Sequence, residues 1–167
     1  MDHAWTCRCC GKSFSTLPLD FACAPPDHWN GLSAEERSKR GKIDSDRCRI
    51  DDDFFIRGCL ELPIIGAEDK FVWGVWVSVS QASFDRILDL WDATNRASEP
   101  AKFGWLCNAI PGYPTTLGLK TNLHLRSDGV RPAIVLEPTD HPLAVEQRHG
   151  VTLERIEEIV AGLSLRH

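Results

Sequence analysis

Two cysteines near the start of the chain have the spacing of half a metal site. Cys7 and Cys10 are separated by two residues, and Gly11 follows them. Two thiolates at this spacing can chelate one Zn²⁺ from a tight turn, and glycine allows the left-handed backbone that such a turn often needs. We therefore predict a structural zinc ion bound by Cys7 and Cys10. Cys48 is the best third ligand, because it lies among charged residues where a buried apolar cysteine is uncommon.

The fourth ligand and two other interpretations of these thiols stay open. Cys23 and His28 are close to equal candidates for the fourth position. A redox Cys-x-x-Cys normally lies at the end of a strand that opens a helix, and no strand is predicted before Cys7. The third interpretation is reduced thiols without metal. Four protein ligands would close the coordination sphere, so a zinc ion here would stabilise the fold and would not catalyse a reaction.

Strand alternation places a second group of polar and charged residues together, as a candidate ligand-binding site. Residues 54–64, 71–80 and 117–126 are rich in β-branched and aromatic residues or alternate in polarity, so we predict strands. One face of each strand is apolar. The opposite faces carry the candidate ligand-binding residues Arg57, Glu61, Trp76, Lys120, His124 and Arg126. If these strands are neighbours, their polar face suits an anionic or planar ligand. The alternative is an ordinary solvated face of an antiparallel sheet.

No catalytic motif stands out in the sequence. It contains no Gly-x-Ser-x-Gly elbow, phosphate-binding glycine loop, His-Glu-x-x-His or dinucleotide fingerprint. The leading hypothesis is therefore a zinc-stabilised module that binds an unidentified small molecule or protein. The alternative is a small hydrolase or transferase in which His124 or His141 acts as general base.

The elements that must position these residues follow from hydrophobic periodicity and capping signals. Ser33 can cap a helix that ends before Gly41, and we interpret the basic residues at its end as solvated. Residues 103–114 are expected to form a loop, punctuated by glycine and proline, with a short buried element. The other predicted elements are helices at 83–93, 140–148 (capped by Asp140) and 152–163, and a hairpin of strands 117–126 and 131–137. This order predicts an α+β fold with a mainly antiparallel sheet of about four to five strands and helices on one face.

Composition sets the class of protein. The chain has 167 residues, is 43% hydrophobic and 26% charged, and carries a formal net charge of −5. We predict a single domain over 1–167, with an irregular, zinc-stapled segment at 1–30 and an α+β core at 45–167. The acidic balance argues against general nucleic-acid binding. The sequence shows no signal peptide and no apolar run of membrane-spanning length, which favours the cytoplasm, where thiols stay reduced.

Several short motifs in order along the chain resemble one family. They are Cys7-x-x-Cys10-Gly11, Cys48-Arg-Ile-Asp, Phe54-Phe-Ile-Arg-Gly, Phe71-x-Trp-Gly-Val-Trp-Val-Ser, Phe103-Gly-Trp-Leu and Thr139-Asp-His-Pro-Leu-Ala. Together they resemble the uncharacterised bacterial domain-of-unknown-function family 2199. The resemblance implies a bacterial, stand-alone, cytoplasmic protein with no assigned activity. That family often has a histidine shortly after its Cys-x-x-Cys, where this chain has Phe14, so the resemblance implies either that the site lacks a fourth protein ligand or that this ligand lies elsewhere.

Overall fold

One sheet dominates the part of the chain that the structure describes. The computed structural model describes residues 4–6, 13–14, 16–127 and 129–164. Its main sheet comprises β3 (Asp20–Ala22), β4 (Gly41–Ile43), β5 (Arg47–Ile50), β6 (Asp53–Pro63), β7 (Lys70–Val79), β8 (Lys102–Leu106), β9 (Lys120–His124) and β10 (Ala133–Leu136). A separate antiparallel pair is formed by β1 (Trp5–Thr6) and β2 (Ser13–Phe14).

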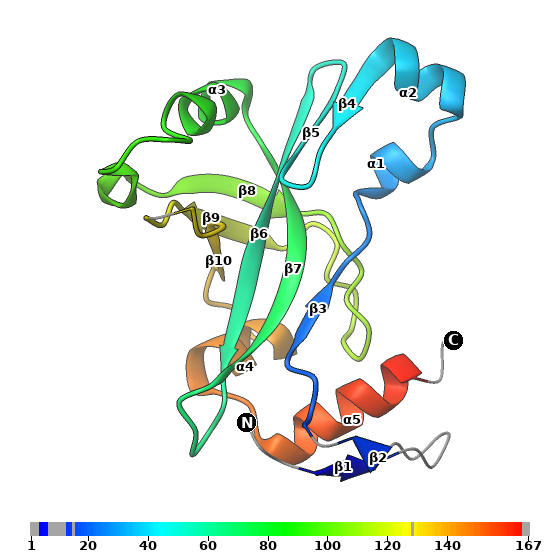
Figure 1. Cartoon of the computed structure of the whole chain (residues 1–167), viewed down its shortest axis with the longest axis vertical. Coiled ribbons are helices and arrows are strands. Elements are labelled where there is room, and N and C mark those ends of the chain that lie inside the picture. Colours follow the sequence, from blue (N-terminus) through cyan, green and yellow to red (C-terminus); the bar gives the residue numbers. More distant parts are fainter. Residues whose placement is uncertain (1–3, 7–12, 15, 128, 165–167) are drawn as a thin grey trace.

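Five strands of the main sheet close into a barrel. The strands β6, β7, β8, β9 and β10 pair in succession, and β10 pairs again with β6 (Figure 1). Successive pairs are antiparallel, whereas β10 and β6 are parallel. An up-and-down barrel with an odd number of strands requires this, because its first and last strands run in the same direction. Outside the barrel, β3 joins β7 in parallel, and the hairpin β4–β5 extends from β6.

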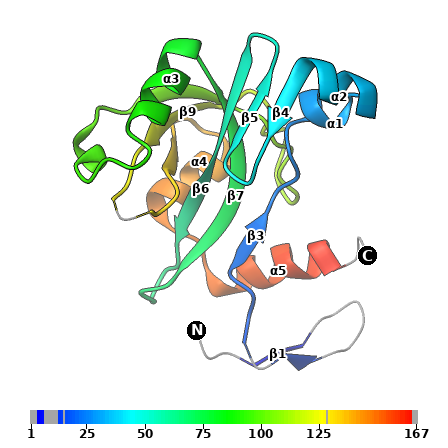
Figure 2. The ribbon, with the colours of Figure 1, turned by 45° about the horizontal axis from the view of Figure 1, so that its top comes forward.

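Helices lie at both ends of the barrel and beside the β4–β5 hairpin. Within the described residues they are α1 (Asp27–Asn30), α2 (Ala34–Arg40), α3 (Gln81–Asp89), the 3₁₀ helix η1 (Arg96–Ser98), α4 (Pro142–His149) and α5 (Leu153–Ser164). α1 and α2 lie on one side of the hairpin and α3 on the other (Figures 1 and 2). The Phe84 ring of α3 packs on Phe54 at the start of β6, whereas Gln147 of α4 donates to the Glu61 carbonyl near its end.

The α+β class is confirmed, and the sheet is mainly antiparallel, as expected, with two parallel strand pairs. Two details of the prediction need correction. The sheet is larger than four to five strands, because residues expected to form a loop with a short buried element supply β8 and the segment expected to be irregular supplies β3. The helices do not cover one face of an open sheet. Because the sheet closes into a barrel, helices lie at the two ends of the barrel instead. Cys7, Cys9 and Cys10 lie outside the described residues.

The predicted apolar strand faces form the barrel interior. Alternate residues of β6 and β7 point inward and are almost completely buried, as are those of β9 and β10. The largest fully buried members are Trp73, Phe71, Ile56, Leu60, Leu62, Leu123 and Ile134. The apolar stripe predicted for the last helix is also confirmed, because Ile156, Ile159 and Val160 of α5 belong to the same core.

A glycine makes the closure of the barrel possible. Gly58 lies on β6 where β10 approaches. A Cβ atom at this position would lie 2.6 Å from Cγ1 of Ile134 and 2.8 Å from the Pro132 carbonyl oxygen. Such contacts are shorter than van der Waals packing allows, so only glycine lets β10 come close enough to pair with β6.

The sequence predicts the N-cap of α2 correctly and that of α4 incorrectly. The Ser33 side chain caps α2, and Glu36 completes a capping box, as the sequence indicated. α4 differs, because its N-cap is His141 and not Asp140. The His141 Nδ1 atom accepts from the Leu143 N–H at 3.1 Å, and its Nε2 atom lies 3.0 Å from the Thr115 carbonyl oxygen. This pattern fits a neutral ring that donates through Nε2, so His141 ties a loop to the start of α4.

Candidate functional site

The six predicted ligand-binding residues do not form one face. Arg57 of β6 lies opposite Trp76 of β7 in the register, whereas Lys120 and His124 lie on β9. Trp76 is only 3% exposed and belongs to a second apolar cluster with Trp29 and Phe55, which also includes Cys48, Ile50 and Cys107. α1 and the β4–β5 hairpin supply part of this cluster. They cover the outer surface of the barrel at the place where an open face was expected.

Glu61 and Arg126 are brought together, but they satisfy each other. The Arg126 guanidinium forms an ion pair with Glu61, and Lys70 pairs with the same carboxylate at 3.1 Å. Burial alone would raise the pKa of Glu61, but hydrogen bonds from Arg126 and Lys70 outweigh it and lower the pKa below its ordinary value. Arg57 extends over Gly74, where a Cβ atom would lie 3.2 Å from its Nη2. Its buried Nε has no hydrogen-bond partner among the described residues.

Lys120 and His124 share an exposed surface with two aromatic side chains that the sequence analysis missed. Trp105 and Phe103 are 45% and 42% exposed on β8. Their ring centroids lie 5.1 Å apart in an edge-to-face arrangement, and Lys120 Nζ lies 6.0 Å from the Trp105 ring centroid. The alternation in Phe103-Gly-Trp-Leu was the available signal, but glycine and proline nearby favoured a loop.

The predicted zinc ligands within the described part lie in apolar surroundings. Cys48 is 1% exposed in the second cluster, and burial raises the pKa of its thiol to about 11. Burial also raises the pKa of the Cys23 thiol to about 11. Raised values disfavour the thiolate that zinc needs. Among the described residues, no group of three or more His, Cys, Asp and Glu side chains is placed to hold a metal ion.

A groove of about 730 Å³ runs beside the β4–β5 hairpin, and we call it the basic groove. Its apolar lining comes from α1, the hairpin and α3 and consists of Trp29, Ile43, Cys48, Phe84 and Leu88. Its cationic lining comes from α2 and the same hairpin and consists of Arg37, Lys42, Arg47 and Arg49. Ser38 and Asp44 complete it. This volume lies within the roughly 300–1,000 Å³ typical of small-molecule sites.

Strand pairing explains how the hairpin presents two kinds of side chain. Lys42 is opposite Arg49 in the register, and Ile43 is opposite Cys48. Because side chains alternate along a strand, the two cations share one face of the hairpin and the two apolar side chains share the other. On α3, Phe84 and Leu88 are four residues apart, so they lie on the same side of the helix.

Three of the four cations in the groove have no carboxylate partner among the described residues. Arg47 pairs with Asp44 at 2.9 Å. Partial burial would raise the pKa of Asp44, but the backbone N–H of Asp46 and the Arg47 groups lower it. Arg37 instead donates to carbonyl oxygens of α1, at 3.3 and 3.4 Å, and Arg49 donates to the Asp51 carbonyl at 3.1 Å. No ion pair of Lys42 is found within the same part of the chain. Excess positive charge therefore borders an apolar groove.

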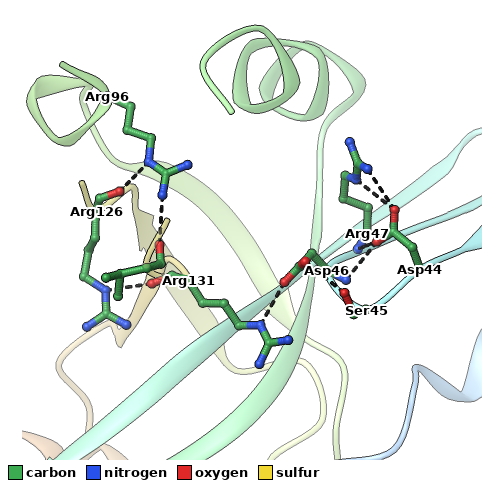
Figure 3. Close-up of polar contacts among 8 residues, drawn as sticks. Asp44, Ser45, Asp46, Arg47, Arg96, Arg126 and Arg131 are labelled. Atoms are coloured by element: carbon green, nitrogen blue, oxygen red, sulfur yellow. Dashed lines mark hydrogen bonds and ion pairs between the residues drawn. The ribbon is translucent and has the colours of Figure 1, made fainter. Parts of the chain in front are cut away.

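A second cavity lies beyond the β4–β5 turn, but its arginines are already engaged. It encloses about 370 Å³, and Arg96 and Arg131 contribute to its lining. Arg131 donates to Asp46 at 2.8 Å, and Arg96 donates to the carbonyl oxygens of Arg126 and Val130 (Figure 3). Arg96 also donates to the Trp91 carbonyl oxygen. These contacts join the segment that follows α3, the β9–β10 connection and the β4–β5 turn. The cluster stabilises the fold, whereas the basic groove has three cations that lack a carboxylate partner among the described residues and is therefore the candidate binding site.

Neither cavity contains a histidine among its described lining residues. His141 caps α4 and contacts a loop, and His124 is exposed on β9. The arrangement expected for a histidine general base, a pocket that holds the ring together with a carboxylate, is therefore not formed by either cavity. None of the described helices has the length and apolarity needed to cross a bilayer.

Comparison with known proteins agrees with the motif-based resemblance. No curated protein and no solved structure matches this chain. One family model, described as an uncharacterised protein conserved in bacteria, matches residues 6–151. The matched region includes every strand of the barrel, the β4–β5 hairpin and α3, so it covers all the elements that line the basic groove. The chain therefore belongs to domain-of-unknown-function family 2199.

Proposed function

We propose that this protein is a non-enzymatic binding module whose basic groove holds a small organic anion. The observation that carries the proposal is the presence of Arg37, Lys42 and Arg49 around an apolar groove without carboxylate partners among the described residues. The chain has a net charge of −5, so this local excess of positive charge is not a property of the whole surface. Cations at a cavity with apolar walls attract and hold anions more strongly than cations on an open surface.

The ligand class agrees with the hypothesis from the sequence, but the residues differ. An anionic ligand was expected beside Trp76, Lys120 and His124. In the proposed site, the ammonium of Lys42 and the guanidinium of Arg49 donate to the anionic group, and Phe84 supplies aromatic surface. Charge-assisted hydrogen bonds from two neighbouring cations suit a carboxylate, which has two acceptor oxygens. The groove therefore recognises charge and needs no catalytic group.

Removing two cations from the groove should weaken binding of an organic anion. For the double variant Lys42→Gln/Arg49→Gln, we expect the affinity for octanoate to fall at least about tenfold, because each lost charge-assisted hydrogen bond contributes about 1.5 kcal/mol or more. Calorimetric titration of the full chain measures this change. Octanol, which has the same tail without charge, should bind the unchanged protein more weakly than octanoate.

The matched control removes two cations outside the groove. Lys39 and Arg86 are paired with Glu35 and Glu99 and do not line the groove. Lys39→Gln/Arg86→Gln should therefore retain the octanoate affinity, although the net charge changes by the same amount. Equal loss in both double variants, or equal affinity for octanoate and octanol, would contradict the proposal.

We also propose that Cys7 and Cys10 hold a structural zinc ion, in a protein that works in the cytoplasm. The support is their spacing, because both residues lie outside the described part of the chain. Protein purified without added metal should contain about one zinc ion per chain, and Cys7→Ser should lose it together with part of the stability. A zinc content near zero, with unchanged stability of Cys7→Ser, would overturn this proposal. Cys48→Ser tests whether the buried thiol contributes, since a true ligand would also change the zinc content.

A further inference from the structure

The apolar wall of the basic groove is built before any ligand binds. Phe84 is 7% exposed and packs on Phe54 in a tilted arrangement with ring centroids 5.0 Å apart, and Trp29 is 9% exposed in the second cluster. Both rings are therefore held by core contacts. Ile43 and Leu88 are only partly buried, so they keep apolar surface available in the groove. A preformed apolar surface can bind hydrocarbon without first having to become ordered.

The cationic part of the groove is held in place by the hairpin itself. Arg47 fixes the β4–β5 turn through Asp44, with Nη2 and Nε contacts of 2.9 and 3.1 Å (Figure 3). Arg49 lies with its guanidinium carbon 5.7 Å from the Phe54 ring centroid, and the Phe54 ring also contacts Phe84. One cation of the groove therefore lies directly beside its apolar wall. A ligand that contacts both must be charged at one end and apolar at the other.

Other ligand types fit this arrangement less well. A highly polar anion would place hydrated groups against Phe84 and Leu88, at a cost in desolvation. A neutral lipid would shield Lys42 and Arg49 from water without bringing a negative charge to pair with them, which costs free energy. An amphipathic anion matches both parts of the lining.

We infer that the basic groove binds a monocarboxylate with a single hydrocarbon tail. The carboxylate lies between Lys42 and Arg49, and the tail lies against α3 at Phe84 and Leu88. This inference rests on the proposed function, since it specifies which organic anion the groove accepts. It adds one property that anion binding alone does not have: affinity must rise with the length of the tail.

A series of carboxylates tests this property. The full chain is titrated by calorimetry with hexanoate, octanoate and decanoate, each below its micelle concentration. We expect the affinity to increase about fourfold with each added methylene group, as for hydrocarbon buried from water. Acetate, which has no tail to bury, should bind far more weakly than hexanoate. An affinity that does not change with tail length would overturn the inference, while the proposed function would survive.

Variants of the apolar wall distinguish the contribution of the tail to the binding affinity from that of the carboxylate. Leu88→Ser should reduce the affinity for decanoate more than that for hexanoate, and the milder Leu88→Ala offers a second test if Leu88→Ser does not fold. Ile65→Ser is the matched control, because Ile65 is 59% exposed and does not line the groove. Equal loss for both carboxylates in both wall variants would contradict the inference. Tighter binding of a glutamate-rich peptide than of decanoate would also contradict it. Failure of every carboxylate to bind would instead overturn the proposed function.

Discussion

Replacing Trp76 with alanine should lower the free energy of unfolding by about 3–5 kcal/mol, the range found when a large aromatic side chain is removed from a core. Trp76 is 3% exposed and packs in the second apolar cluster, beneath α1 and the β4–β5 hairpin. Its backbone N–H also donates to Oδ1 of Asn108 at 2.7 Å, so the surrounding structure is ordered on both sides. Little can move to fill the space that the indole ring would leave.

Trp105 provides the matched comparison. It is the same residue type in the neighbouring strand, but it is 45% exposed. Trp105→Ala should cost about 1 kcal/mol or less, since it loses mainly the contact with Phe103. Urea denaturation of both variants measures the difference. If Trp105→Ala were the more destabilising substitution, Trp76 would lie on an open surface, as the sequence alone suggested.

Replacing Arg96 with alanine should destabilise the fold by at least about 3 kcal/mol, because hydrogen bonds from a charged donor contribute about 1.5–3 kcal/mol each and their acceptors would be left buried. Arg96 is 6% exposed, although arginine is rarely buried. It donates to the carbonyl oxygens of Trp91, Arg126 and Val130. Arg96→Lys should recover only part of the loss, because one ammonium group cannot reproduce the planar fork that reaches three segments.

Arg47→Ala is the control that distinguishes the hydrogen bonds of Arg96 from its contact with the Trp91 ring. The guanidinium carbons of Arg47 and Arg96 lie 5.3 and 6.0 Å from the same Trp91 ring centroid. Arg47, however, pairs with Asp44 within one turn at a half-exposed position. Arg47→Ala should therefore cost about 1 kcal/mol or less. Similar losses for Arg47→Ala and Arg96→Ala in urea denaturation would show that the carbonyl contacts of Arg96 do not stabilise the fold.

The elements determined by local sequence were predictable. Strand alternation identified the inward residues of β6, β7 and β9 correctly, because a strand has only two faces and the barrel fills one of them. The capping box at Ser33 marked the start of α2. Helical spacing of Ile156, Ile159 and Val160 identified the buried side of α5.

Features that depend on distant segments were not predictable in the same way. Gly58 looks like an ordinary glycine in a strand until β10 is placed against it. Trp76 has the alternation of an outward residue, and outward is its true direction, but α1 covers that part of the barrel. A strand pattern gives the direction of a side chain and does not show whether a second layer lies above it.

The basic groove was missed for a related reason. Arg37 belongs to a helix end that the sequence predicts to be solvated, and nothing in the sequence pairs Lys42 with Arg49. Their common position depends on the register of β4 and β5 and on α3, which begins about 30 residues later. Cations without carboxylate partners can be recognised only after the ion pairs of their neighbours are known.

The central claim, that the basic groove binds an organic anion, is tested most directly by an NMR titration of the ¹⁵N-labelled full chain with octanoate. The largest changes in chemical shift should occur at the backbone amides of Lys42, Ile43 and Arg49 on the hairpin and of Phe84 and Leu88 on α3. They should saturate together as one binding event. Changes confined to the exposed surface around Trp105 and His124, or no saturating change at all, would contradict the claim.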